Sequence, residues 1–520
     1  MLNRIAPGAE VLLLALVSGL GAGGYAVFSA PGFPLDDAWI HLQLARNLSA
    51  GNGFGLNAGE SVSLSTAPLW TLIVALLYVL PWEIKASIKT IGALLLFGNA
   101  LLTRSLALEL GLGRSWGLLA GLVVGLTPRL LWASQSGMEV LLYAFLASGG
   151  LILHLQTFTR TPSLWGTVLL ALAVLARPEA AILFPLAFLD RWRANRRFGE
   201  VLVLYRWHGV LFVALLVPWA LFNAQYGSGV LPNTYYAKVG SYGLPGALAD
   251  GAWQRVGATL LFYPLVQVQE LIRFSVENNV VFTLAIPLGL LAILKKGREG
   301  SWIFVLVLVG FPILRGILAP FKGATFQQGR YAAYLIPLLT VAGLVGLKET
   351  WAMLRSGLDF PLQRRLRNWL SRLVWVLVLG NLLVLDLRDG RKYGENVADI
   401  NQMHVAMGHW LAANTPINAV VATNDIGAIA YFSHRRVIDI VGLATPEILG
   451  HLQPGVSADL GVLQYLEKVQ PDYLVLLPNW YPQLAEMSYL FRPVHSIEVG
   501  PETIAGGTRL VAYRTVWAED

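Results

Sequence analysis

Long apolar runs separated by short polar segments fill the first three quarters of the chain. Most of these runs have about 15 to 22 residues, close to the length that an α-helix needs to cross a bilayer. The runs that we expect to be membrane spans are residues 11–29, 84–107, 116–131, 138–155, 164–176, 180–189, 209–223, 279–294, 302–318, 331–347 and 373–387. The pattern therefore predicts a polytopic α-helical membrane protein with about eleven transmembrane helices.

The pattern changes near residue 391, where the composition becomes that of a soluble domain. We expect a helix at residues 398–413, strands at AVVAT, RRVIDIVG and DYLVLLP, and a late hairpin of HSIEV with GTRLVAYRT. Alternating strands and helices predict a partly parallel α/β sheet. Asn424, Asp425 and Asp439 follow strands, where turn and capping roles explain them better than a ligand site does. The chain thus divides into a transmembrane module, residues 1–390, and a soluble α/β domain, residues 391–520.

Composition agrees with a membrane protein. Of the 520 residues, 55% are hydrophobic and 13% are charged, whereas about a quarter of a soluble chain is charged. A formal net charge of +7 could indicate a nucleic-acid partner, but the basic residues gather in short loops between apolar runs. The absence of cysteine excludes disulfides, thiolate metal sites and cysteine nucleophiles. Membrane lipids are therefore the expected partner, and nucleic acid is not.

The basic loops also predict an orientation. Residues 191–197, 295–298 and 348–372 hold most of them, and the positive-inside rule places these loops in the cytoplasm. The alternating segments then face outward, namely the turns at 136–139 and 177–179, the loops at 226–277 and 320–330, and everything after about residue 389. We expect a multi-pass protein of the plasma (inner) membrane with an external or periplasmic C-terminal domain.

One segment decides the side of the first polar loop, residues 30–83. PLWTLIVALLYVLP, residues 68–81, has an apolar part of about 12 residues, shorter than the roughly 17 that a span requires. Trp70 and Trp82 stand where an interfacial belt would hold them. We therefore expect a juxtamembrane helix on the outer surface, which places the loop on the same side as the C-terminal domain.

Two adjacent aspartates, Asp36 and Asp37, begin this loop in the sequence PGFPLDDAWIHLQLARNL, with His41 one turn further on. Carboxylates at a membrane boundary are costly to desolvate and usually have a partner or a task. They could act as a general base or hold a divalent cation. Helix capping is the alternative, and it explains one aspartate more easily than two. The glycine-rich stretch that follows opens no phosphate-binding helix, so a dinucleotide site is excluded.

Two outward turns carry further candidates. Glu139 begins a helix, where an acid also favours the helix dipole, so function and capping are equally good explanations. Arg177 and Glu179 interrupt two apolar runs, and they form either a site or an ion pair that closes a turn.

The longer outward loops carry cations beside aromatic residues. In LPNTYYAKVG, Asn233, Tyr235 and Tyr236 suit sugar hydroxyls and Lys238 suits a phosphate, although an interfacial anchor with a snorkelling lysine explains the same pattern. Lys322 and Arg330 flank FKGATFQQGRY, and cations on the outer face indicate an anionic partner. Arg129 is a weaker candidate of the same kind.

These motifs together suggest a family. LDDAWIHLQLARNLSAGNGFGLNAGE, SGMEV, ARPEA, LPNTYYAKVG, GRYAAYLIP and VATNDIGAIAYFSHRRVIDIVGLATPEI are similar to segments of the GT-C class of membrane glycosyltransferases. Within that class they resemble the bacterial branch that includes the terminal β-(1→2)-arabinofuranosyltransferase of mycobacterial cell walls. The resemblance covers nearly the whole chain, and its strongest element is the DDAW loop combined with PNTYYAK.

The resemblance implies a polyprenyl-phosphate sugar donor, with arabinofuranose as one option for the sugar. It implies that Asp36 or Asp37 is the catalytic base and that external cations such as Lys238, Arg330 or Arg177 hold the lipid phosphate. The expected acceptor is a hydroxyl of a cell-envelope glycan or glycolipid, and the expected stereochemistry is inversion. The sequence establishes no cofactor, and the aspartates could hold a divalent cation.

Two other classes of protein remain alternatives. A transporter or flippase would favour charged residues and broken helices near mid-membrane in repeated halves. The chain has no internal repeat, and its polar residues cluster at one face, which favours the enzyme. The other alternative is a sensor or scaffold, whose function would not depend on Asp37.

Overall fold

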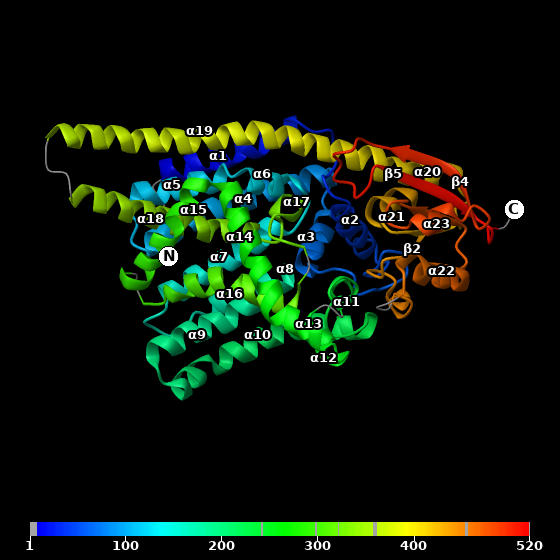
Figure 1. Ribbon diagram of the computed structural model, residues 1–520, viewed down its shortest axis with the longest axis horizontal. Coiled ribbons are helices and arrows are strands. Elements are labelled where there is room, and N and C mark those ends of the chain that lie inside the picture. Colours follow the sequence, from blue (N-terminus) through cyan, green and yellow to red (C-terminus); the bar gives the residue numbers. More distant parts are fainter. Residues whose placement is uncertain are drawn as a thin grey trace.

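The structure is a computed structural model that describes residues 8–240, 243–296, 299–320, 322–356, 361–452 and 456–518. A bundle of helices forms most of the molecule, and a small sheet with short helices lies at one end of it (Figure 1). The helices of the bundle are α1 (Gly8–Val27), α2 (Asp36–Ser49), α3 (Pro68–Leu77), α4 (Ile84–Glu109), α5 (Arg114–Gly125), α6 (Pro128–Gln135), α7 (Val140–Gln156), α8 (Leu164–Ala176), η2 (Pro178–Ile182), α9 (Leu183–Asn195), α10 (Phe198–Tyr226), α11 (Asn233–Lys238), α12 (Leu244–Ala249), α13 (Trp253–Gly257), η4 (Ala258–Phe262), α14 (Tyr263–Asn278), α15 (Val280–Lys296), α16 (Trp302–Leu318), α17 (Phe326–Gly329), η5 (Ala333–Leu335), α18 (Ile336–Ser356) and α19 (Pro361–Ile400).

Four of the described helices are long and apolar enough to cross a membrane: α1, α4, α10 and the helix over Ala333–Met353. The pair α5 and α6 makes a fifth if it counts as one span bent by 53°. The bend comes at Pro128, since the residue before a proline is forced out of helical geometry. The other apolar helices are shorter, so the expected number of about eleven spans stays a prediction.

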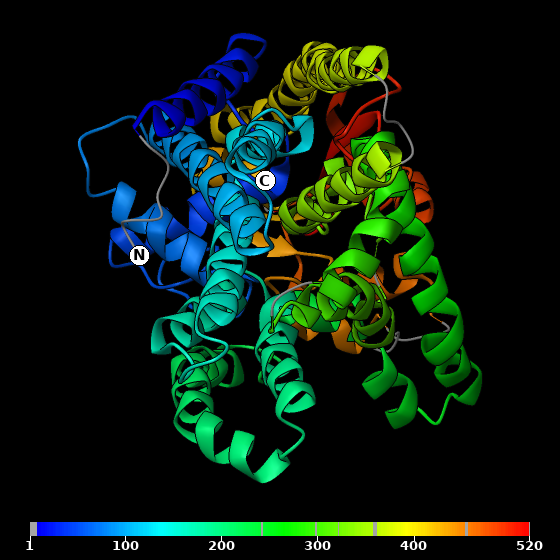
Figure 2. The same ribbon diagram turned by 90° about the vertical axis from the view of Figure 1, so that its left-hand side faces the viewer.

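The longest helix joins the two parts of the molecule. The expected span at residues 373–387 lies inside α19, which has 40 residues and runs from the far end of the bundle to the sheet (Figure 1). Seen along the bundle in Figure 2, α19 lies beside α1, and Tyr25 contacts Tyr393 with ring centroids 5.8 Å apart.

Glycines allow some helices of the bundle to pack at close range. A Cβ atom on Gly289 of α15 would collide with the carbonyl oxygen of Ala342 in α18, and one on Gly346 would collide with that of Ala285. Close backbone approach at small residues is the usual way in which helices associate in lipid, where no hydrophobic effect drives them together.

The loop expected at residues 226–277 is mostly helical, which corrects the sequence-based expectation. It contains α11, α12, α13, the π-helical turn η4 and α14. Proline at the second position starts α14, and this helix packs along α16, where Gly316 leaves room for the backbone of Pro264.

The expected juxtamembrane segment is a short helix, α3, which begins at Pro68 and buries one face. Trp70, Thr71 and Val74 are buried, whereas Leu72 and Leu76 are exposed. The indole Nε1 of Trp70 donates to the Gly137 carbonyl oxygen at 2.8 Å. The helix is thus tied to the turn at 136–139, and its position on the membrane surface stays a prediction.

The C-terminal part folds around a five-stranded sheet of order β2-β1-β3-β5-β4. Strands β1 (Val420–Thr423), β2 (Arg436–Asp439) and β3 (Tyr473–Leu476) are parallel, whereas β5 (Arg509–Thr515) runs antiparallel to β3 and to β4 (Phe491–Glu498). The partly parallel sheet and the late hairpin are therefore confirmed. Its helices are η6 (Asn401–Val405), α20 (Ala406–Asn414), α21 (Gly427–Ser433), η7 (Pro446–Gly450), α22 (Ala458–Val469) and α23 (Pro482–Glu486).

The two ends of the bundle differ in character. The turn between α9 and α10 and the C-terminal end of α18, which belong to the expected basic loops, lie at the end opposite to the sheet (Figure 1). Residues 297–298 and 357–360 of these basic loops lie outside the described residues. The polar turns that the sequence singled out meet at the end that carries the sheet.

Candidate active site

A cavity of about 460 Å³ lies at this end of the bundle. Eight of the residues singled out in the sequence line it: Asp37, His41, Glu139, Arg177, Glu179, Tyr235, Lys238 and Arg330. Its apolar lining includes Ile40, Met138, Leu231, Val239, Phe311, Leu314 and Leu318. Leu443 of the C-terminal domain also lines the cavity. The lining of the cavity is therefore amphipathic and combines ionic groups with apolar side chains.

Asp37 is held by an arginine that comes from a distant part of the chain. Arg330 donates from Nη1 to Asp37 Oδ2 at 2.5 Å, and the side chains are 6% and 35% exposed, respectively. Burial raises the pKa of Asp37, but the positive charges of Arg330 and Lys238 outweigh this effect and hold the pKa well below its usual range. Asp37 is thus ionised and partly open to the cavity.

The backbone that presents Arg330 has an uncommon geometry. Gln327, Gln328 and Gly329 have φ angles of 45°, 59° and 77°, in the left-handed region that favours glycine. Such positions persist only where the surroundings hold them, and they cluster at functional sites. The segment from Gln327 to Gly329 turns the chain so that Arg330 enters the cavity.

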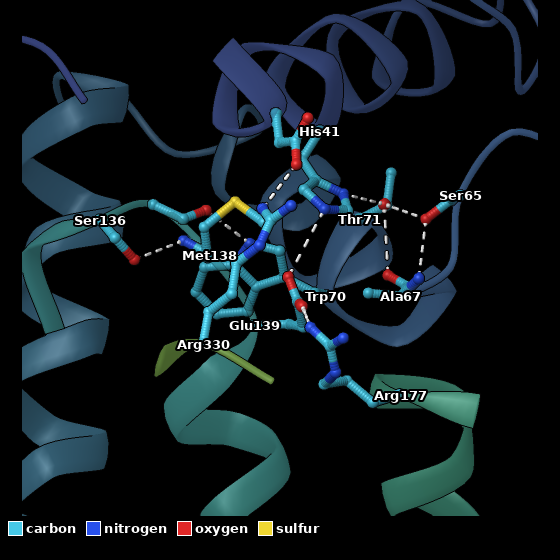
Figure 3. Close-up of polar contacts among 12 residues, drawn as sticks. His41, Ser65, Ala67, Trp70, Thr71, Ser136, Met138, Glu139, Arg177 and Arg330 are labelled. Carbon is cyan, nitrogen blue, oxygen red and sulfur yellow. Dashed lines mark hydrogen bonds and ion pairs between the residues drawn. The ribbon is translucent and has the colours of Figure 1, made fainter. Parts of the chain in front are cut away.

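A chain of polar contacts fixes His41 above this site (Figure 3). Its Nδ1 lies 2.9 Å from Thr71 Oγ1, which in turn lies 3.1 Å from Ser65 Oγ. Its Nε2 lies 3.7 Å from Glu139 Oε2. Burial lowers the pKa of His41, even though Glu139 and Asp37 oppose this effect. His41 is therefore a held, mostly neutral group beside Asp37.

Arg177 forms ion pairs with two carboxylates. It donates to Glu139 Oε1 at 2.5 Å and to Glu179 Oε1 at 2.9 Å, and Figure 3 shows it directed at Glu139. The ion pair that the sequence offered as an alternative explanation is thus present. Burial raises the pKa of Glu179, but Arg177 outweighs this effect and lowers the pKa overall.

Arg315 is a site residue that the sequence reasoning missed. It lies at the end of α16, is buried, and lines the cavity. Its guanidinium lies 4.9 Å from the ring centroid of Tyr331, which Arg177 at 4.9 Å and Arg330 at 5.0 Å also contact. The sequence did contain a feature that could have identified Arg315, because this arginine lies inside an expected span and charged residues within apolar runs are usually functional.

The structure does not bring every candidate into the cavity. Asp36 points to the C-terminal domain, where its Oδ2 and Oδ1 accept from the backbone N–H groups of Gly427 and Ala428 at 2.7 and 2.8 Å. Arg129 forms an ion pair with Glu277 at 2.6 Å in a separate cavity. Lys322 lies outside the cavity lining, with its Nζ 5.3 Å from the ring centroid of Phe326.

Two residues of α11 hold the local structure instead of lining the cavity. Asn233 is fully buried, and its side-chain oxygen accepts from the backbone N–H of Ser228 at 2.9 Å. The hydroxyl of Tyr236 accepts from the backbone N–H of Leu231 at 3.4 Å. Both side chains shape the turn that carries Tyr235 and Lys238 to the cavity.

The aspartates do not form a shared metal site. Both oxygens of Asp36 accept backbone hydrogen bonds, and Asp37 is occupied by Arg330. Among the residues that the structure describes, no group of three or more His, Cys, Asp or Glu side chains could hold a metal ion. We therefore derive no step through a metal.

Comparison with known proteins places these features in context. Residues 395–515 match a family model described as a domain of unknown function (DUF8728). Over 496 residues, 88% of this chain and 70% of the relative, the sequence is 28% identical to the terminal β-(1→2)-arabinofuranosyltransferase of Mycobacterium tuberculosis.

Solved structures show the same fold. ArnT from Cupriavidus metallidurans bound to undecaprenyl phosphate gives a TM-score of 0.61 at 14% identity, over 99% of this chain and 100% of that chain. The oligosaccharyltransferase AglB from Archaeoglobus fulgidus, in complex with an inhibitory peptide and a dolichol-phosphate, gives 0.60 at 14% identity, over 98% and 74%. The chain thus has the fold of these solved membrane proteins, and its sequence is similar to that of an arabinofuranosyltransferase.

Proposed function

We propose that the enzyme transfers a sugar from a polyprenyl-phosphate donor to a hydroxyl of a cell-envelope glycan or glycolipid, with Asp37 as the general base. The observation that carries this proposal is the pair of Asp37 and Arg330, 2.5 Å apart, in the lining of an amphipathic cavity. An ionised carboxylate beside cations suits a reaction in which a proton is removed from a hydroxyl and a phosphate leaves.

The cavity suits a lipid phosphate in particular. Arg330, Arg315 and Lys238 offer cations for the phosphate oxygens, whereas Arg177 is already balanced by Glu139 and Glu179. The wall formed by Phe311, Leu314 and Leu318 can take the first isoprene units. Undecaprenyl phosphate and dolichol-phosphate are bound in the structures of ArnT and AglB, and these ligands support the same class of donor here.

The chemistry follows from these positions. The acceptor hydroxyl oxygen attacks the anomeric carbon, the bond from that carbon to the phosphate oxygen breaks, and the lipid phosphate leaves with the electron pair. The hydroxyl proton passes to Asp37. Glu139 and Glu179, the other carboxylates among the described residues that line the cavity, are both paired with Arg177, and we therefore expect a single displacement that inverts the anomeric centre.

Binding of the donor phosphate would also raise the basicity of Asp37. Among the described contacts, Asp37 is the anion that pairs with Arg330. The charge of Arg330 keeps the pKa of Asp37 low. A phosphate that binds Arg330 and Lys238 neutralises part of this charge, so the pKa of Asp37 rises and the carboxylate becomes a stronger base. The identity of the transferred sugar is not assigned by these positions, and the sequence relative makes arabinofuranose the first candidate.

The proposal includes a placement in the membrane. The expected basic loops lie at the end of the bundle opposite to the sheet, whereas the cavity includes Leu443 of the C-terminal domain in its lining. The positive-inside rule therefore supports a cavity and a C-terminal domain, residues 391–520, on the outer side of the inner membrane. We propose that residues 1–390 form the transmembrane catalytic module and that the C-terminal domain completes its outer face.

The test is sugar transfer in proteoliposomes with synthetic polyprenyl-phosphoryl arabinofuranose as the first donor. Asp37→Asn should lower kcat by about 1000-fold, because general-base catalysis contributes about 10² to 10⁴. Arg315→Gln should raise the donor KM about 10-fold or more through the lost charge-assisted hydrogen bond. Arg197→Gln is the matched control and should leave both constants near the wild-type values, since Arg197 is exposed and lies outside the cavity lining.

Wild-type activity of the Asp37→Asn variant would contradict the proposed mechanism. A wild-type protein that transfers no sugar from any polyprenyl-phosphate donor, but moves such a lipid between leaflets, would favour the flippase alternative. Mass spectrometry of the lipid that copurifies with the protein would name the donor chain.

A further inference from the structure

Helix α2 has two functional faces. Asp37, Ile40 and His41 line the cavity, at positions i, i+3 and i+4. The neighbouring face, with Asp36, Trp39 and Arg46, lies against α21 of the C-terminal domain. Because successive helical residues are rotated by about 100°, the two adjacent aspartates point in different directions.

Asp36 contacts the first turn of α21 through both of its carboxylate oxygens. The backbone N–H groups of Gly427 and Ala428 donate to them at 2.7 and 2.8 Å. Residue 427 has to be a glycine for this approach, since a Cβ there would collide with the carbonyl oxygen of Asp36. The contact joins residues that are 391 positions apart in the chain.

Further contacts extend this attachment along α2. The Trp39 ring, 2% exposed, lies 5.2 Å from the Tyr431 ring and 4.8 Å from the Phe432 ring, centroid to centroid. Arg46 donates to the Tyr431 carbonyl oxygen at 3.0 Å, and its guanidinium lies 4.3 Å from the centroid of the Tyr431 ring. Hydrogen bonds and ring contacts thus fix α2 against α21 over three turns.

The surroundings of Asp36 belong to the C-terminal part. His404 of η6 is 1% exposed, and its Nε2 lies 3.2 Å from Asp425 Oδ2, directly before α21. On the neighbouring face of α2, Asp37 lies at the start of the helix and has Arg330 as the partner in its described side-chain hydrogen bond.

We propose that Asp36 is a positioning residue and that the C-terminal domain holds α2, through Asp36 and α21, at the angle that presents Asp37 to the donor. This inference rests on the proposed function and gives the domain of unknown function a role in the reaction. The domain orients the catalytic base, and among its described residues Leu443, an apolar side chain, lines the cavity. Asp36 and Asp37 then have separate tasks.

The experiment compares Asp36→Ala, Asp36→Asn and Gly427→Ala in the full chain. Asp36→Ala removes both acceptor oxygens, and Gly427→Ala displaces Asp36 without changing its chemistry. Both should lower kcat by about 100-fold and leave the Kd for undecaprenyl phosphate within about two-fold of wild type, because a shift of about 1 Å at the base affects the reaction more than binding. Asp36→Asn keeps one acceptor oxygen and should retain more activity than Asp36→Ala.

Amide hydrogen exchange supplies a readout that does not depend on activity. In wild type the N–H groups of Gly427 and Ala428 should be protected, and in Asp36→Ala they should exchange faster. The control is Gly500→Ala in the same domain, where a Cβ meets nothing within 4 Å, and it should match wild type in kcat and exchange.

Two results would overturn the inference. One is wild-type kcat in Gly427→Ala together with complete loss in Asp36→Asn, which would make Asp36 a chemical participant. The other is unchanged protection of Gly427 and Ala428 in Asp36→Ala. If the wild-type protein transfers no sugar, the proposed function fails, and the exchange experiment still decides whether Asp36 holds α21.

Discussion

At the scale of single residues, the separation of Asp36 from Asp37 is the most informative feature. Asp37 faces Arg330 and the cavity, whereas Asp36 caps a helix of another domain. Burial, together with the charge of Asp425, raises the pKa of Asp36, although His404 and the hydrogen bonds from the backbone N–H groups of Gly427 and Ala428 oppose this effect. Asp37 has the opposite shift. Two identical side chains, adjacent in sequence, thus acquire different acidities from different partners.

The pKa of Asp37 gives a prediction about pH. Arg330 and Lys238 hold this pKa low, so removing the charge of Arg330 should raise it. The acidic limb of kcat/KM, which reports the free enzyme, should therefore move to higher pH in Arg330→Gln than in wild type. Measuring kcat/KM from about pH 3 to about pH 8, a range that begins below the ordinary aspartate pKa of about 3.9, checks this.

Arg330→Lys is the control for this pH profile, since it keeps the charge and loses the planar fork. It should bind the donor less tightly but leave the acidic limb near its wild-type position. An unchanged acidic limb in Arg330→Gln would mean that Asp37 is not the group that titrates.

Sequence reasoning identified Asp37, Arg330 and Lys238 and could not assign their partners. Helical spacing shows that residues 36 and 37 point apart, but the surface that each meets depends on segments nearly 300 and 400 positions away. Arg315 was missed because its apolar neighbours led us to interpret the whole segment 302–318 as a membrane span. Asn233 and Tyr236 have the composition of a sugar site, and only their hydrogen bonds show that they shape α11.

At the scale of elements, apolar periodicity predicted the strands of the sheet and most of the helices, but it missed α14. That helix carries polar residues such as Gln267 among its buried positions, so the helical stripe is interrupted. The sequence pattern also did not predict the local structure of residues 325–330. Its left-handed turn at Gln327 and Gln328 uses residues that rarely adopt positive φ, so local sequence preferences point elsewhere.

This segment gives a prediction at the element scale. Gly329 has φ 77°, and a Cβ on it would lie 2.8 Å from Arg129 Nη1 and would collide with the Phe274 ring. Gly329→Ala should therefore displace Arg330 and lower kcat/KM by about 100-fold, as expected for a misplacement of about 1 Å.

Gln328→Gly is the matched variant of the same segment. It removes the cost of a positive φ at a non-glycine residue, about 1 kcal/mol or more, and should keep activity and not lower the melting temperature. Equal activity in Gly329→Ala and Gln328→Gly would show that the segment does not control the position of Arg330.

At the scale of the whole molecule, the alternation of expected spans predicted that the polar turns lie on one side of the membrane. The cavity joins residues from the first loop, the turns at 136–139 and 177–179, α11 and the segment before η5. Direct contacts also tie the first loop to the C-terminal domain, since the side-chain oxygen of Asn57 accepts from the Val437 N–H at 2.8 Å. A cavity assembled from so many segments needs all of them on the same side of the membrane.

The side itself is a prediction that cysteine labelling can check, because the chain has no cysteine of its own. The structure selects exposed positions: Ala58 in the first loop, Glu498 in β4, and Ala194 near the expected cytoplasmic turn between α9 and α10. On intact cells a membrane-impermeant maleimide should label Ala58→Cys and Glu498→Cys, and it should reach Ala194→Cys only after the membrane is opened. The reverse pattern would place the cavity in the cytoplasm, and labelling of only one of Ala58→Cys and Glu498→Cys would contradict the contact between the loop and the domain. Since the proposed polyprenyl-phosphate donor would have to reach the cavity from the leaflet on the same side, this measurement also decides from which leaflet the protein could take it.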